Sequence, residues 1–84
     1  KDETFHILHG TLVVIRNDIK HILNKGDKID IRSGDWHSFE SDEGAIFEEI
    51  STIYGQSAME KRKKLLYLNS VTHQFFCLCL KTTP

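Results

Sequence analysis

The amino-acid sequence predicts a small all-β domain whose antiparallel strands form a barrel or a sandwich. Short runs rich in valine, isoleucine and leucine recur at regular spacing along the first half of the chain. Glycine, asparagine and aspartate, the residues that turns prefer, separate these runs. The chain contains a single proline. Short strands joined by such turns favour a barrel or a sandwich over a sheet built with crossover helices.

The N-terminal quarter of the chain predicts three strands. Thr4–Leu8 alternates between two faces, and the preceding Glu3 shares its face with apolar residues. Thr11–Arg16 is rich in β-branched residues. Asn17-Asp18 is a two-residue hairpin signal, after which Ile19–Leu23 returns antiparallel.

The histidines of this region are expected to lie on the surface or to pack against the sheet. His6 faces away from Glu3, and His9 adjoins the turn at Gly10. His21 lies in the middle of the third predicted strand, and we expect it on the solvent side.

The next segment predicts a fourth and a fifth strand. Asn24–Asp27 turns the chain into Lys28–Ile31, and Arg32–Asp35 forms a second turn. The fifth strand begins near His37, which shares a face with Phe39. If Phe39 points into the core, so does His37. A buried imidazole then needs a partner, because an unsatisfied buried polar group costs roughly 1–3 kcal/mol.

Two adjacent carboxylates interrupt the next apolar strand, Ala45–Thr52. Alternation sends Glu48 and Glu49 to opposite faces, so only one of them can point inward. Glu49 shares its face with Phe47 and Ser51, and we expect it to be the inward one. The alternative is that both are ordinary edge-strand charges, which discourage aggregation.

The composition changes at residue 55, so the sequence divides into a barrel core over residues 1–54 and a C-terminal extension over residues 55–84. Ser57–Glu60 is a capping-box pattern, which predicts a short helix through Lys61–Leu68. Val71–Leu80 is an apolar run, either a buried strand or a segment foreign to the domain. His73 and the cysteines of Cys77–Cys79 supply only three donors, without the spacing of structural zinc sites.

Charge and composition exclude several classes of partner. The chain has 11 basic and 12 acidic residues, so it lacks the basic surface of a nucleic-acid-binding protein. The basic run Lys61–Lys64 is typical of a solvated face. No apolar run approaches the roughly 20 residues that span a bilayer, which predicts no membrane partner. Cys77 and Cys79 are too close together for an ordinary disulfide, which favours a reducing, cytoplasmic location.

Two motifs resemble those of the cupin superfamily. Glu3, six residues and then Gly10 resemble the end of the first cupin motif. Gly26, five residues, and then Arg32-x-Gly34-x-x-His37-x-x-x-Ser41 resemble the second motif. Cupins usually have proline where this chain has Arg32, and often asparagine where it has Ser41. The resemblance covers residues 1–54 and implies an antiparallel jelly-roll β-barrel.

The cupin resemblance also implies a metal site. In the family, a His-x-His pair, a following glutamate and the histidine of the second motif hold the ion. Glu3 and His37 match the last two ligands, whereas the His-x-His pair would fall before Lys1, which predicts a barrel truncated at its N-terminus. The full ligand set would suit manganese, iron, zinc or nickel.

Glu49–Thr52 is similar to the corresponding stretch of cupin sugar isomerases of the D-lyxose isomerase kind, and of cupin modules associated with sialic-acid-type synthases. The first similarity implies a metal-dependent aldose–ketose isomerase that acts on a small sugar, with Glu49 as its base. The alternative is a non-catalytic carbohydrate-binding or sensing module, so whether the chain is an enzyme stays open. A small core with unpaired sheet edges predicts self-association through an edge strand or through Val71–Leu80, most simply as a homodimer.

Overall fold

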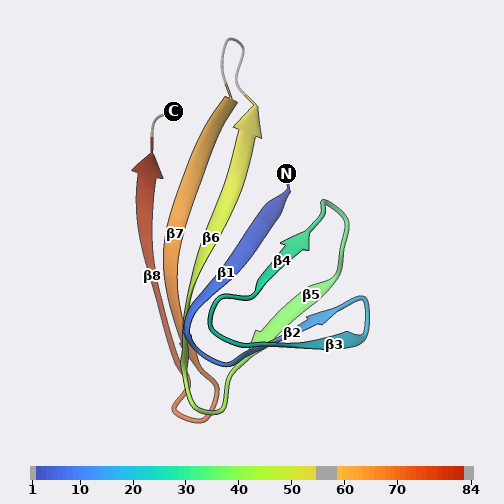
Figure 1. Cartoon of the computed structure of the whole chain (residues 1–84), viewed down its shortest axis with the longest axis vertical. Coiled ribbons are helices and arrows are strands. Elements are labelled where there is room, and N and C mark those ends of the chain that lie inside the picture. The colour runs from blue at the N-terminus through green and yellow to red at the C-terminus, as the bar shows by residue number, and fades with distance from the viewer. Residues whose placement is uncertain (1, 55–58, 83–84) are drawn as a thin grey trace.

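The computed structural model describes residues 2–54 and 59–82, which form eight strands in two sheets (Figure 1). The strands are β1 (Glu3–Gly10), β2 (Leu12–Arg16), β3 (Ile19–Leu23), β4 (Lys28–Ile31), β5 (His37–Glu40), β6 (Ala45–Tyr54), β7 (Met59–Asn69) and β8 (Gln74–Thr82). The all-β prediction is confirmed. No helix in the described part of the chain could cross a membrane.

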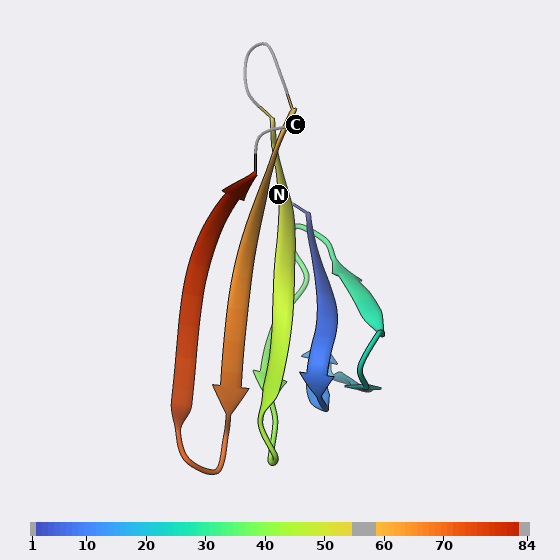
Figure 2. The same ribbon diagram turned by 60° about the vertical axis from the view of Figure 1, so that its left-hand side comes forward.

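All strand pairings are antiparallel, and they divide the strands into two sheets of unequal size. The larger sheet has the order β4-β1-β6-β7-β8, and the smaller has the order β3-β2-β5. Figure 2 shows the five strands of the larger sheet side by side, from β8 on the left to β4 on the right. The smaller sheet packs against one face of the larger sheet, which we call its inner face.

The predicted antiparallel barrel holds only in part, because the two sheets are not closed into one. A barrel closes only where the edge strands of its sheet pair with one another. Within the described residues, the edge strands β4 and β8 of the larger sheet make no ladder with β3 or β5 of the smaller one. The result is two packed sheets with free edges.

The predicted C-terminal helix is wrong over the residues that the structure describes. Ser57 and Ala58 lie outside them, but Met59–Asn69 forms strand β7, which pairs with the whole of β6. The basic run that resembles a helix surface alternates in the strand, since Lys63 neighbours Glu48 on one face and Lys64 neighbours Glu49 on the other. Pairing with the ten residues of β6 stabilises β7 as a strand. This pairing outweighs the helix propensity of the same residues, which amounts to less than roughly 1 kcal/mol per residue.

The Asn17-Asp18 hairpin turn is confirmed. Both residues have positive φ, at 50° and 67°, as a two-residue turn matched to the twist of its strands requires. Asparagine and aspartate tolerate this left-handed region better than other residues that carry a side chain. The turn brings β3 back along β2 over their full length.

The core lies between the sheets and thins out toward β8. It is made of nine buried apolar side chains: Phe5, Ile7, Leu12, Val14, Ile29, Ile31, Ala45, Phe47 and Leu66. On the inner face of the larger sheet, Phe47 of β6 is fully buried and Leu66 of β7 is 6% exposed, whereas Phe75 of β8 is 58% exposed. The smaller sheet therefore covers the larger one as far as β7 and leaves β8 uncovered.

Candidate functional site

Polar side chains gather beyond the buried Phe5, on the inner face of the larger sheet and on the facing strand β5. We call this region the inner mouth and define it by Glu3, His37, Glu49, Ser51 and Lys64. Glu3 is on β1, Glu49 and Ser51 are on β6, and Lys64 is on β7, all on the inner face of the larger sheet. His37 comes from β5 of the facing sheet.

Glu49 is the most buried carboxylate of the inner mouth. It is 9% exposed, on the same face of β6 as the buried Phe47 and Ser51, as the alternation of that strand predicts. Its register neighbours are Phe5 on β1 and Lys64 on β7. Lys64 Nζ lies 3.7 Å from Glu49 Oε2. A carboxylate flanked by an aromatic ring and an ammonium group is held in place and shielded from bulk water.

Ser51 contributes a hydroxyl that has no hydrogen-bond partner within the described residues. It is 1% exposed, and its Oγ is fully buried. Glu3 lies directly opposite on β1 and is half-buried. An unsatisfied buried hydroxyl costs roughly 1–3 kcal/mol. A polar ligand or an ordered water that enters the inner mouth would recover that energy.

His37 lies at the exposed end of the inner mouth rather than inside the core. Its ring centroid is 6.4 Å from that of Phe5 and 5.4 Å from that of Phe39. Its Nδ1–H donates to the Asp35 carbonyl oxygen at 3.3 Å. Glu3 is two residues before Phe5 on the same face, so the two predicted metal ligands lie at the same end of the inter-sheet space, on facing sheets.

The described residues do not assemble a metal centre. Nowhere among them do three histidine, cysteine, aspartate or glutamate side chains come together as an ion would require. Glu3 and His37 are donors that suit a divalent transition metal, but two donors are fewer than the three or four that a protein site for such an ion uses.

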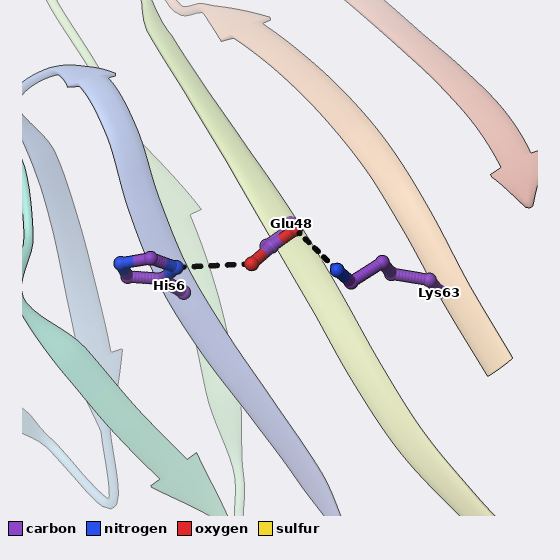
Figure 3. A network of polar contacts seen from close by, with 3 residues as sticks. All are labelled: His6, Glu48 and Lys63. Carbon is purple, nitrogen blue, oxygen red and sulfur yellow. Dashed lines mark hydrogen bonds and ion pairs between the residues drawn. The ribbon is translucent and has the colours of Figure 1, made fainter. Parts of the chain in front are cut away.

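The outer face of the same strands carries a second polar group, the network of His6, Glu48 and Lys63 (Figure 3). His6 Nδ1 donates to Glu48 Oε1 at 2.9 Å, and Lys63 Nζ lies 3.3 Å from Glu48 Oε2. The hydrogen bond from His6, with help from the Lys63 ammonium, lowers the pKa of the Glu48 carboxyl. Glu48 and Glu49 thus occupy opposite faces of β6, each with a lysine of β7 beside it.

His21 faces the other sheet, contrary to the prediction of a solvent-side residue. It pairs with Val14 on β2, and Val14 is fully buried, so the two side chains share the inner face of the smaller sheet. His21 Nε2 is buried and finds no hydrogen-bond partner in the part of the chain that the structure describes. Alternation alone could not predict which way His21 points. Each face of β3 carries at least one apolar side chain, isoleucine or leucine, together with one polar side chain.

The sequence prediction missed Lys64 and Ser51 as members of the inner mouth. Ser51 could have been found, because it lies two residues after Glu49 and alternation places both on one face. Lys64 could not have been found in this way. The sequence predicts a helix at this position, and a helix would not place Lys64 beside Glu49 on a neighbouring strand.

A shallow cleft on the outside of the smaller sheet holds the only tryptophan of the chain. Trp36 is 85% exposed, and the cleft beside it has a volume of about 200 Å³ with Ile15, Asp18, His37 and Ser38 in its lining. Its backbone is fixed on both sides, because its N–H donates to Asn17 Oδ1 at 3.1 Å and its carbonyl accepts from the Asn17 N–H at 2.8 Å. The exposed indole is therefore presented on a rigid turn.

Asp35 holds this turn from the other side. Its carboxylate accepts from the Arg32 N–H at 3.0 Å and from Asn17 Nδ2 at 3.2 Å. These hydrogen bonds, first that of Arg32 and then that of Asn17, lower the pKa of the Asp35 carboxyl.

Comparisons with family models, with curated proteins and with solved structures found no match to this chain.

Proposed function

We propose that this chain is a cupin-type domain that binds a small sugar at the inner mouth and interconverts its aldose and ketose forms. The observation that carries the proposal is Glu49, a buried carboxylate that points between the sheets with Lys64 beside it. The two antiparallel sheets and the cupin-like motifs around Glu3 and His37 support it.

Aldose–ketose isomerisation needs one base that can move a proton between neighbouring carbons. The base takes the proton from the carbon next to the carbonyl, and the electrons of that C–H bond form the C=C bond of an enediol while the carbonyl oxygen takes up a proton. The neighbouring hydroxyl then loses its proton to become the new carbonyl, and the first proton returns to the former carbonyl carbon. Glu49 has the shielded position that such a base requires. The Lys64 ammonium lies beside this carboxylate and can donate to a sugar oxygen. The Ser51 hydroxyl can bond a further hydroxyl of the sugar.

A divalent metal would act as a cofactor only where all the ligands of the cupin motif are present. Glu3 and His37 would supply two of its ligands, and the His-x-His pair of the cupin motif is not among the 84 residues. A metal in such a site would polarise the sugar oxygens.

Proton exchange with solvent tests the role of Glu49. The chain is incubated with aldoses and ketoses in deuterated water with a divalent metal, the ion is then chelated, and NMR follows the loss of the C1 and C2 proton signals. We expect Glu49→Gln to slow exchange on the order of 10²–10⁴-fold while circular dichroism shows an unchanged β fold. Glu48→Gln is the matched control, since it removes the neighbouring carboxylate from the opposite face, and it should exchange as fast as the parent.

Two results would overturn this proposal. Equal exchange by the Glu49→Gln variant and the parent would show that Glu49 is not the base. A parent chain that exchanges no sugar proton with any metal would remove the isomerase function itself.

A second candidate function, non-catalytic carbohydrate binding, is favoured by Trp36. Sugar rings expose C–H groups that stack on a flat aromatic face, and Trp36 offers its indole almost fully to solvent. The lining of the cleft includes polar side chains, those of Asp18 and Ser38, that can bond ring hydroxyls. A cleft of about 200 Å³ accommodates one sugar ring.

Tryptophan fluorescence tests the second function directly, because Trp36 is the only source of indole emission. Titration with monosaccharides should give a saturable change in emission, and Ser38→Ala should weaken the apparent affinity several-fold. Glu49→Gln should leave the titration unchanged, which separates this cleft from the inner mouth. Emission that never saturates with any sugar would contradict a carbohydrate site at Trp36.

A further inference from the structure

β8 differs from the other edge strands in length and in charge. β3, β4 and β5 have four or five residues each and carry charged side chains such as Lys20, Asp30 and Glu40. β8 has nine residues, of which Lys81 is the only charged one. Charge and short length are the means by which edge strands avoid pairing with another chain. β8 has neither of these protections along most of its length.

Both faces of β8 are apolar and exposed over residues 75–78. On the inner face, Phe75 is 58% exposed and Cys77 is an exposed free thiol. On the outer face, Phe76 is 62% and Leu78 is 57% exposed. The outer face continues into an apolar cleft of about 210 Å³ whose lining includes Ile46, Leu65 and Tyr67.

We infer that β8 pairs antiparallel with β8 of a second copy of this chain, which joins the two larger sheets into one. The pairing goes beyond the proposed function and does not depend on it. A two-fold axis at Cys77 places each Cys77 opposite its counterpart and each Phe76 opposite the partner's Leu78. In this arrangement Phe76 and Leu78 meet on the outer face, the two Cys77 residues meet on the inner face, and Lys81 lies away from its counterpart.

A second copy suits this edge better than a charged partner. Between Gln74 and Leu80 the strand offers no charge that could pair with one, so a charged partner would lose solvation without compensation. Covering Phe75, Phe76 and Leu78 removes roughly 300 Å² of side-chain surface per copy. Standard interfaces bury about 800 Å² per partner, so even with the strand backbone added the dimer should be weak enough to dissociate on dilution.

The first test measures mass against concentration by sedimentation velocity. The parent chain should shift from monomer to dimer as concentration rises. Phe76→Asp and Leu78→Asp should each raise the dissociation constant at least 10-fold, since each would place a charge in the apolar pairing. Ile22→Asp is the matched control on β3, where Ile22 is 67% exposed, and it should associate like the parent. Circular dichroism confirms that each variant retains its β content.

A parent chain that stays monomeric at every concentration would overturn the inference, and so would β8 variants that associate as tightly as the parent. Species larger than a dimer would also overturn it, because a two-fold pairing of β8 with itself closes.

The second test needs no disruptive substitution. Directly opposite residues of antiparallel strands have Cβ atoms close enough for a disulfide between cysteines. Mild oxidation with copper phenanthroline should therefore link the Cys79→Ser chain into a dimer through Cys77. The Cys77→Ser chain should link much more slowly, because Cys79 then faces Phe75 of the partner. Equal rates for the two variants would refute the alignment at Cys77.

Discussion

Gly10 is a residue whose replacement the structure cannot accommodate without movement. Its φ of +79° lies in the left-handed region, where glycine is favoured. A Cβ atom at this position would also collide with the Gly44 carbonyl oxygen, which belongs to backbone and cannot rotate away. Gly26 has a similar φ of +91°, but a Cβ there would meet open space.

This pair of glycines separates backbone strain from crowding. Gly26→Ala should lower the free energy of unfolding by roughly 1–2 kcal/mol, the cost of a left-handed alanine. Gly10→Ala should lower it by that amount and by a further 1–3 kcal/mol or so, because the new methyl group pushes β1 away from the turn at Gly44. Urea denaturation of the two variants measures both values. If they are equal, the approach of Gly44 to Gly10 is looser than the structure shows.

Across three neighbouring strands, the network of His6, Glu48 and Lys63 connects β1, β6 and β7 on the outer face. A carboxyl whose pKa is lowered by folding stabilises the folded state above its unfolded pKa, which is about 4.3 for glutamate. That stability is lost as the pH falls through the folded pKa. The lowered pKa of Glu48 therefore predicts that this carboxylate stabilises the folded state fully at neutral pH and no longer does so in acid.

Glu48→Gln should thus destabilise the chain at pH 7 and cost progressively less as the pH falls below about 4. We expect a difference of about 1 kcal/mol or less at neutral pH, since Lys63 is partly exposed and solvent screens its charge. Thermal or urea denaturation across this pH range measures the difference between variant and parent. A difference that stays constant with pH would show that the network does not favour the ionised carboxylate.

The elements that the sequence predicts well are those in which alternation and turn chemistry agree. Glu49 could be placed inward because Phe47 and Ser51 share its face, and the Asn17-Asp18 turn needed only its own residue types. β7 was missed because a serine with a glutamate three residues later looks like a helix start, whereas the strand depends on pairing with β6. The inward orientation of His21 was not predicted, because neither face of β3 is clearly apolar in sequence. The pairing with β2 determines which face of β3 points inward.

At the scale of the whole molecule, two sheets of unequal width decide what remains exposed. A list of strands does not say which edges meet, so closure into a barrel could not be derived from the strands themselves. The inner mouth could not be derived either, because Lys64 and His37 reach it from strands of different sheets. What the smaller sheet covers becomes core, and what it leaves uncovered at β8 is where pairing with a second copy is proposed.

The position of β1 next to β6 has a consequence for how the chain is made. Glu3 pairs with Ser51, 48 positions later, whereas Asn69 pairs with Gln74 only five positions later. A ribosome adds about 5–20 residues per second, so β1 waits on the order of seconds for its central neighbour. Until then β4 is the one strand of the larger sheet that has emerged beside β1, and Phe5 and Ile7 lack their neighbours Glu49 and Phe47 on β6. The nascent chain is therefore most in need of a chaperone before β6 leaves the ribosome, and least in need once the local hairpin of β7 and β8 has formed.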